Sequence, residues 1–273
     1  MGKKLKNRYI GDTEIALSEI GLGTVKLGRD TDVKYPHPFK IPDDNAVLEL
    51  LSVAYSLGVN YLDTAVAYGI ALKRLGQLLP RLDFKFKIVV KIGERYSVET
   101  GSKYDFSINA LTADLKSVRV NLDREFLEIV LLHCGNIDTG QRVVDGIAML
   151  KAEKKEGRIG AVGVSCKTLE GVKLSLAEGV DVIMIEPVLY AITREILHSN
   201  DAKVGVLVKK VFSSGTILSA GVAAGEILSD QLNDEAISSI VIGTINTTHL
   251  RANVKNLVYS DLLNYSEIPD KRV

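Results

Sequence analysis

The stretch Phe126-Leu127-Glu128-Ile129-Val130-Leu131-Leu132-His133 decides the fold class. Apart from Glu128, it is an unbroken apolar series that ends at His133, without any alternation of apolar and polar residues. A strand with one face in water alternates, whereas a strand covered on both faces is apolar throughout. The stretch therefore predicts a buried strand of a parallel sheet.

Similar runs recur on both sides of this stretch, separated by residues with helical spacing such as Ile108, Leu111 and Leu115. With the first stretch they make about eight strand–helix units, the number that closes a (β/α)8 TIM barrel. The other predicted strands are Ile20–Val25, Asn60–Asp63, Phe86–Lys91, Ile159–Ser165, Asp181–Glu186, Val204–Val208 and Ser239–Ile242.

An α/β barrel needs roughly 250 residues, so we expect residues 1–273 to form a single barrel domain. A β-hairpin around Gly11-Asp12, spanning Arg8–Ile15, is predicted to precede the first barrel strand. An open doubly wound sheet is the alternative, but it normally begins with a G-x-G-x-x-G turn. The early glycines Gly21, Gly23 and Gly28 have a different spacing, so we favour the barrel.

The composition excludes several functional classes. Hydrophobic residues make up 46% and charged residues 25%, and 34 basic residues balance 34 acidic ones. Without a basic excess the chain is not expected to bind nucleic acid, and no run reaches the ~18 apolar residues of a membrane span. The cysteines Cys134 and Cys166 form no disulfide framework or metal-ligand motif, so no metal is expected. No apolar segment of a secretory signal follows the basic N-terminus, which favours the cytoplasm.

Polar residues at the carboxyl ends of neighbouring strands are the candidate catalytic groups, because barrel active sites lie at that face. These are Asp63, Lys91 and His133, together with Tyr68 a short distance after Asp63. Each has a structural interpretation: Asp63 could cap a loop, Lys91 could reach out to water, and Tyr68 and His133 could be satisfied core groups. An ion pair between Asp63 and Lys91 beside Tyr68 is the functional interpretation.

Such a group of side chains suits the reduction of a carbonyl by hydride, since the developing oxyanion needs a proton donor and a hydrogen-bond partner. Tyr68 would donate the proton, and the ammonium of Lys91 is expected to lower the phenol pKa. Asp63 would orient the lysine. A neutral His133 would donate a hydrogen bond to the same oxygen.

Motifs along the whole chain resemble those of the aldo-keto reductase family. The resemblance includes the segment with Asp63 and Tyr68 and the strands that end in Lys91 and His133. The matching segments are Gly21–Thr24, Leu62–Gly69, Val89–Gly93, Leu131–His133, Lys155–Ser165, Val241–Thr244 and Leu250–Asn253.

The resemblance implies a cofactor, NADPH with NADH as an alternative, extended across the barrel mouth. It also implies Tyr68 as proton donor and a small-molecule aldehyde or ketone as substrate. The positions that it assigns to the cofactor are Gly23, Thr24, Ser165, Cys166, Lys209, Phe212, Ser214, Gly215, Gly243, Thr244, Asn246, His249 and Asn253.

Several of these positions depart from the family pattern. Cys166 and Met184 stand where an amide side chain usually holds the nicotinamide, and the usual stacking aromatic is replaced around Lys209-Lys210. His249 occupies a position often held by arginine near the 2′-phosphate. A weaker preference for NADPH over NADH is therefore expected.

Two other functional classes remain alternatives. The barrel could bind a nicotinamide nucleotide with little or no turnover, as a sensor or partner subunit, which the departures at Cys166 and Met184 would explain. Less favoured is an aldolase in which Lys91 forms a Schiff base. The sequence indicates no oligomeric state.

Overall fold

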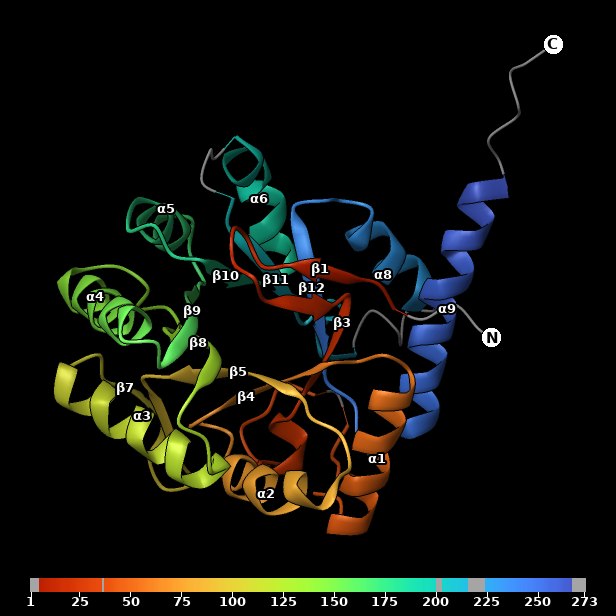
Figure 1. Ribbon diagram of the computed structural model, residues 1–273, viewed down its shortest axis with the longest axis horizontal. Helices are drawn as coiled ribbons and strands as arrows, with labels where there is room; N and C mark the ends of the chain where they lie inside the picture. Colours follow the sequence, from red (N-terminus) through yellow and green to blue (C-terminus); the bar gives the residue numbers. More distant parts are fainter. Residues whose placement is uncertain (1–4, 36, 200–202, 216–223, 267–273) are drawn as a thin grey trace.

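A closed barrel of eight parallel strands forms the centre of the protein (Figure 1). The structure is a computed structural model that describes residues 5–35, 37–199, 203–215 and 224–266. Around the barrel the strand order is β10-β11-β12-β3-β4-β5-β8-β9, so the last strand pairs with the first. Their bounds are β3 Ile20–Gly23, β4 Tyr61–Ala65, β5 Lys87–Ile92, β8 Leu127–His133, β9 Ile159–Ser165, β10 Val182–Ile185, β11 Gly205–Lys209 and β12 Ile237–Ile242. The predicted TIM barrel is confirmed, and the open doubly wound sheet is wrong.

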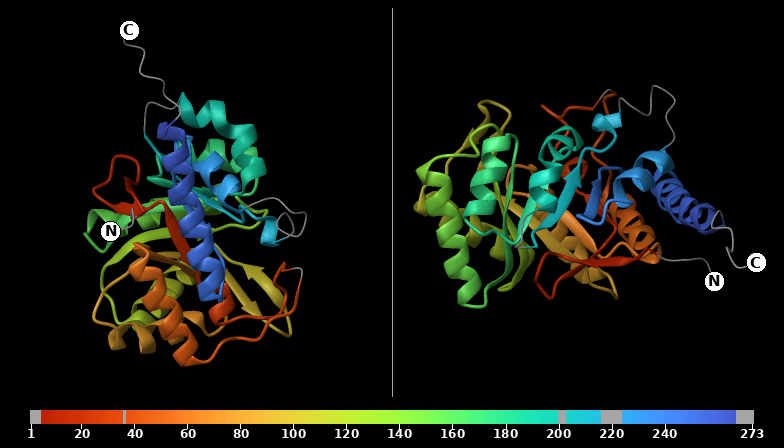
Figure 2. Two further views of the ribbon diagram at one scale, coloured as in Figure 1. Left: turned by 90° about the vertical axis from the view of Figure 1, so that its right-hand side faces the viewer. Right: turned by 90° about the horizontal axis from the view of Figure 1, so that it is seen from above.

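Helices surround the barrel, as the views in Figures 1 and 2 show. Asp43, Ser107 and Thr168 each cap a helix by accepting a hydrogen bond from a backbone N–H three residues ahead. On one side of the barrel α1 packs against α9. The helices are α1 Asp44–Ser56, α2 Ala71–Leu78, α3 Ile108–Leu122, α4 Gln141–Lys155, α5 Leu169–Ala177, α6 Pro187–His198, α8 Ala224–Leu232 and α9 Thr247–Ser266, with one-turn helices η1 Val25–Leu27, η2 Leu79–Arg81 and η3 Ser213–Gly215.

Strand β8 shows why the deciding stretch is apolar without alternation. Ile129 and Leu131 belong to the cluster inside the barrel, whereas Val130 and Leu132 belong to the larger cluster between strands and helices. All four side chains are fully buried. Both faces of the strand are therefore covered, as predicted.

The barrel interior is filled by side chains rather than left open. The largest is Tyr61, whose hydroxyl lies 2.8 Å from Ser239 Oγ. A Cβ on Gly21 would lie 1.9 Å from the Tyr61 ring, so only glycine leaves room for the ring there. The interior is thus a packed core, and any ligand site must lie at its ends.

The predicted N-terminal hairpin is present as the antiparallel pair β1 (Asn7–Tyr9) and β2 (Ala16–Ser18). Its Ile10 and Leu17 join the interior cluster, and Ile10 lies against Gly205 at the start of β11. The hairpin therefore closes the N-terminal end of the barrel.

A second hairpin was not predicted from the sequence. It pairs β6 (Glu94–Ser97) with β7 (Gly101–Tyr104) directly after β5. Gly93, with φ at +95°, turns the chain from β5 into this hairpin. The hairpin therefore lies at the carboxyl end of the barrel, beside the ends of β5 and β8.

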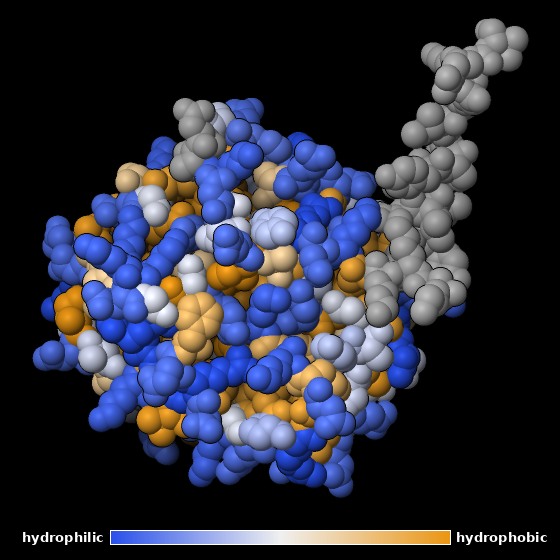
Figure 3. Space-filling view, viewed as in Figure 1, coloured by the Kyte–Doolittle hydropathy of each residue, from blue (hydrophilic) through white to orange (hydrophobic). Residues whose placement is uncertain are grey.

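Hydrophilic residues cover much of the face of the molecule shown in Figure 3. On the face shown in Figure 3, apolar residues appear in separate patches between hydrophilic ones. Among the described residues, none of the helices is long and apolar enough to cross a membrane.

Candidate active site

The carboxyl ends of β4 and β5 place an acid and an amine in contact. Asp63 is in β4, and Lys91 is in the paired strand β5. The Lys91 ammonium donates a hydrogen bond to Asp63 Oδ1 and forms an ion pair with it. Their side chains are only 1% and 5% exposed, so the predicted ion pair is present and is almost closed to water.

Tyr68 and His133 complete a group of four side chains at this end of the barrel. The Lys91 Nζ lies 5.1 Å from the centre of the Tyr68 ring. The imidazole of His133 meets the same ring edge-on, with centroids 6.2 Å apart. The structure therefore brings together all four side chains that the sequence singled out.

The pKa of Tyr68 differs from the expectation. Burial raises it well above its ordinary value of about 10, and the negative charge of Asp63 adds to the increase. A lowered pKa was expected from the sequence, and that expectation was wrong in its direction. The physical reason is that removal of the phenol from water and the negative charge of Asp63 both disfavour the tyrosinate.

A fifth side chain, Glu94 of the unpredicted hairpin, contacts this group. Its Oε2 lies 2.7 Å from His133 Nδ1, and its Oε1 accepts a hydrogen bond from Ser102 at 2.5 Å. The contact with His133 lowers the pKa of Glu94 to about 2 against the effect of burial. Burial lowers the pKa of His133 to about 4, although Glu94 opposes this. His133 is therefore neutral and faces an ionised carboxylate.

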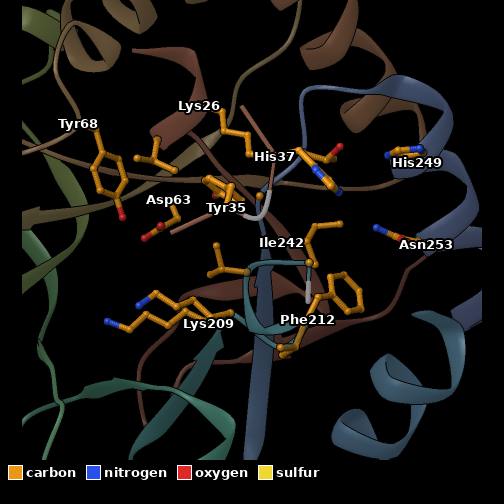
Figure 4. A pocket seen from close by; sticks show the side chains of 18 of the residues that line it. Lys26, Tyr35, His37, Asp63, Tyr68, Lys209, Phe212, Ile242, His249 and Asn253 are labelled. Carbon is orange, nitrogen blue, oxygen red and sulfur yellow. The ribbon is translucent and has the colours of Figure 1, made fainter. Parts of the chain in front are cut away.

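A cavity of about 570 Å³ extends from this group along the barrel mouth (Figure 4). Tyr68, Asp63 and Lys209 lie at one end of it, and His249 and Asn253 lie at the other. Eight of the predicted cofactor positions line this cavity. They are Gly23, Lys209, Phe212, Gly215, Gly243, Thr244, His249 and Asn253.

Four other predicted cofactor residues, all described, do not line the cavity. Thr24 is buried and donates its hydroxyl to the Asp63 carbonyl. Cys166 is buried, with its thiol 3.4 Å from Ser175 in α5. Asn246 caps α9, because its Oδ1 accepts hydrogen bonds from two backbone N–H groups. These contacts give the three side chains structural roles in this structure.

Ser165 is the fourth of these residues, and it connects to the cavity through Lys209. The Lys209 ammonium donates a hydrogen bond of 2.6 Å to Ser165 Oγ. Met184, the other departure noted in the sequence, fills the barrel interior. Ser214 belongs to η3, and its side chain lies outside the described part of the structure.

Lys209 has an unusual electrostatic environment. Burial and the positive charge of three neighbouring lysines lower its pKa to about 7. Glu186 opposes this decrease, but it already forms ion pairs with Lys167 and Lys210. The cavity wall therefore includes an amine that changes its charge near neutrality.

The loop after β3 contributes side chains that sequence reasoning missed. Lys26, Tyr35 and His37 line the cavity, and the Lys26 Nζ lies 3.7 Å from the centre of the Tyr35 ring. Tyr35 also packs against Gly243, where a Cβ would lie 2.8 Å from its hydroxyl. The loop thus reaches across to the end of β12. Three prolines in this loop were the only signal of a fixed conformation.

Comparisons with known proteins give a consistent result. The model of the Aldo/keto reductase family matches residues 19–218. A solved structure from Pseudomonas aeruginosa, assigned to the aldo-keto reductases, is 33% identical with a TM-score of 0.78, covering 93% of this chain and 94% of that one. The aldo-keto reductase AKR11C1 of Bacillus halodurans, in its holo form, has a TM-score of 0.75 at 20% identity, covering 93% and 91% of the two chains. At this level of identity, the similarity to AKR11C1 supports the barrel fold alone.

A curated relative matches over a shorter region. The uncharacterized oxidoreductase YqkF of Bacillus subtilis (strain 168) is 26% identical over 166 residues, which are 59% of this chain. The match spans 49% of the length of that relative.

Proposed function

Because the chain belongs to the aldo/keto reductase family, we propose that it reduces small aldehydes or ketones to alcohols with NADPH, with Tyr68 as the proton donor. The observation that carries this proposal is the grouping of Lys91 and His133 around Asp63 and Tyr68. Asp63 and Tyr68 line one end of a long cavity. Family membership implies NAD(P)H-dependent carbonyl reduction. The preference for NADPH and the roles of the individual residues are part of the proposal.

Tyr68 suits the role of a general acid although its pKa is raised. A high pKa keeps the phenol protonated at neutral pH, so the proton is present when substrate binds. The oxygen of a carbonyl that receives hydride becomes an alkoxide, about as basic as hydroxide, whose conjugate acid has a pKa of about 15.7. Tyr68 therefore releases its proton only as that charge develops.

Lys91 and Asp63 support this transfer electrostatically. When Tyr68 loses its proton, the ammonium of Lys91 5.1 Å from the ring centre stabilises the negative charge. The ion pair with Asp63 holds that ammonium in place. The same pair argues against the Schiff-base alternative, since Lys91 is 1% exposed and its amine is already engaged.

The residues of the cavity fit an extended anionic dinucleotide. The cavity runs from Tyr68 to Asn253, and Lys26, Lys209 and Lys210 supply positive charge along it. Bound NADPH would supply the hydride that reduces the carbonyl carbon. Gly243, Thr244, His249 and Asn253 would hold its phosphate-bearing end, and Lys209 with Phe212 the end beside Tyr68.

The preference between NADPH and NADH depends on His249 in this proposal. Imidazole has fewer hydrogen-bond donors than guanidinium, and it lacks the planar fork that binds phosphate with two of them. NADPH is still expected to bind better than NADH, with a smaller margin than an arginine would give. The cytoplasm remains the expected compartment.

Two measurements on the purified protein test the function. The change in NADPH fluorescence on titration with the protein reports binding, and the loss of NADPH absorbance with 4-nitrobenzaldehyde reports turnover. Binding followed by steady oxidation of NADPH supports the proposal. Binding without oxidation across several aldehydes would favour a sensor or partner subunit instead.

A further inference from the structure

An ammonium group is fixed at the end of the cavity where Tyr68 lies. Lys209 lines the cavity, and its Nζ donates a hydrogen bond of 2.6 Å to Ser165 Oγ. Ser165 is the last residue of β9 and pairs in register with His133, the last residue of β8. The positive charge of Lys209 also contributes to the lowered pKa of His133. The ammonium therefore lies close to the four grouped side chains.

The acids around this ammonium are already occupied. Glu186 accepts hydrogen bonds from both Lys167 and Lys210, so three lysines surround a single carboxylate. In the part of the chain that the structure describes, no carboxylate forms an ion pair with Lys209 itself. This end of the cavity therefore has an excess of positive charge.

Hydride transfer determines which part of the cofactor meets this charge. In the proposed function, hydride passes directly from the nicotinamide ring to a carbonyl carbon whose oxygen contacts Tyr68. Atoms that react directly must approach to about 3–3.5 Å. The ring must therefore lie at the Tyr68 end of the cavity, where Lys209 also lies, while the rest of the dinucleotide extends toward His249 and Asn253 (Figure 4).

The reduced and oxidised cofactors differ by one charge, and that charge is on the ring. The ring of NADPH is neutral and the ring of NADP⁺ is cationic, whereas their phosphates are identical. We propose that Lys209 is a specificity-determining residue that selects the reduced cofactor, because its ammonium repels the cationic ring of NADP⁺ but not the neutral ring of NADPH. This inference rests on the proposed function and deepens it.

The selection has a consequence for the direction of the reaction. When both forms of the cofactor are present, the cavity holds mainly NADPH and is ready to reduce a carbonyl. The NADP⁺ that forms is bound less tightly and leaves more readily. The protein therefore works as a carbonyl reductase with weak inhibition by NADP⁺, rather than as an alcohol dehydrogenase.

The size of the effect follows from the reciprocity of the two interactions. The ammonium weakens the binding of the cationic ring by the same free energy by which the ring lowers the pKa of the ammonium. A like charge a few Å away shifts a pKa by about one unit, which corresponds to about a tenfold change in a dissociation constant. At pH 6 we expect the Kd of NADP⁺ divided by that of NADPH to be about fivefold to tenfold lower in Lys209→Met than in the wild type.

The charge of Lys209 also makes this preference depend on pH. Its pKa is lowered to about 7, so the side chain is charged at pH 6 and neutral at pH 9. The Kd ratio of the wild type should therefore be higher at pH 6 than at pH 9. In Lys209→Arg the guanidinium keeps its charge at both pH values, so the ratio should stay high at both.

Several titratable groups near Lys209 keep one charge state between pH 6 and pH 9. His133 is neutral, because burial lowers its pKa to about 4. Tyr68 is protonated, because burial raises its pKa well above 10. The thiols of Cys134 and Cys166 are protonated, since burial raises the pKa of both. None of these side chains can produce the expected pH dependence.

The other charged neighbours of Lys209 are members of ion pairs. They are Lys91 with Asp63, and Lys167 and Lys210 with Glu186. All of these pairs are retained in Lys209→Met. Any pH dependence that remains in this variant therefore measures their contribution, and the difference from the wild type belongs to Lys209.

The two dissociation constants can be measured without turnover. The fluorescence of NADPH on titration with protein gives the constant of the reduced form, and displacement of NADPH by NADP⁺ gives that of the oxidised form. The ratio cancels the contribution of the phosphates, which both forms share. His249→Ala is the matched control, because this side chain lies at the other end of the cavity and should change both constants alike. NADH and NAD⁺ differ by the same ring charge and should show the same dependence on Lys209.

The outcomes separate this inference from the proposed function. A ratio that falls from pH 6 to pH 9 in the wild type, stays high in Lys209→Arg and stays low in Lys209→Met supports the inference. Equal ratios in the wild type and Lys209→Met at pH 6 would overturn it. Failure of both nucleotides to bind would contradict the inference and the proposed function together. Binding with the expected ratio, but without oxidation of NADPH by any aldehyde, would contradict the proposed function alone.

Discussion

Lys91 and Asp63 form an ion pair that is almost closed to solvent, with side-chain exposures of 1% and 5%. Removal of one partner from such a pair leaves the other charge buried without compensation. This typically lowers the free energy of unfolding by about 3–5 kcal/mol. Lys91→Met should therefore abolish turnover and also lower the free energy of unfolding by about this amount in urea titrations.

Two further variants separate the charge effect from packing. Asp63→Asn combined with Lys91→Met removes both charges, so its unfolding free energy should recover toward the wild-type value while activity stays lost. Lys85→Met, an exposed position just before the same strand, should change little. A Lys91→Met protein as stable as the wild type would contradict this account, because it would mean that water reaches the carboxylate of Asp63.

Tyr68→Phe tests the proton donor. The substitution removes only the hydroxyl and leaves the aromatic packing against His133. Loss of a general acid usually lowers turnover by about 100-fold or more, and we expect that loss in kcat for 4-nitrobenzaldehyde. Tyr9→Phe, at an exposed tyrosine of β1, is the control. Wild-type turnover in Tyr68→Phe would remove this residue from the mechanism.

The cofactor preference should depend on the side chain at position 249, which lines the far end of the cavity. Guanidinium offers more hydrogen-bond donors than imidazole and binds the 2′-phosphate that NADPH has and NADH lacks in a bidentate way. The wild-type protein should therefore favour NADPH over NADH by a smaller ratio of dissociation constants than His249→Arg.

Variants at position 249 show whether this side chain recognises the phosphate. His249→Ala should lower the preference for NADPH, because it removes the side chain that would contact the phosphate. His249→Arg should raise the preference, because guanidinium keeps its charge and binds phosphate with two donors. An unchanged ratio in His249→Ala would place the recognition of the phosphate elsewhere.

Lys209→Met should stabilise the fold in a pH-dependent way. The pKa of Lys209 is lowered to about 7 in the folded protein, whereas the pKa of a lysine in an unfolded chain is about 10.4. Below pH 7 the buried side chain is charged, and burial of this ammonium lowers the free energy of unfolding. Between about pH 7 and pH 10 the unfolded state binds more protons than the folded state, so the free energy of unfolding rises with pH and the destabilisation disappears.

The free energy of unfolding of Lys209→Met should thus exceed that of the wild type by ~2 kcal/mol near pH 6.5, with solvent access to the cavity taken into account. The difference should shrink steadily up to pH 10. Lys173→Met, at an exposed position of α5, should show no such trend. A constant difference across this range would contradict the lowered pKa.

The barrel and the four grouped side chains could be predicted because both depend on short-range patterns. Buried strands such as Leu127–His133 must be apolar on both faces, and the side chains at their carboxyl ends must meet at one rim. Asp63, Lys91 and His133 follow from that rule alone.

The remainder depended on contacts between distant segments. Glu94 reaches His133 only because Gly93 turns the chain into a hairpin, and Tyr35 crosses the mouth to Gly243. The pKa of Tyr68 depends on burial, which no local pattern reports. Asn246 could have been recognised, since asparagine at the start of a helical pattern is a preferred cap.

The most direct test of the central claim follows the hydride itself. NADPH that carries deuterium in place of both C4 hydrogens is incubated with the wild-type protein and 4-nitrobenzaldehyde in ordinary water, and the alcohol is examined by mass spectrometry. Hydride transfer to the carbonyl carbon with a solvent-derived proton on oxygen predicts one deuterium, located on the carbinol carbon. An alcohol without deuterium, or NADPH that stays unoxidised, would contradict the account.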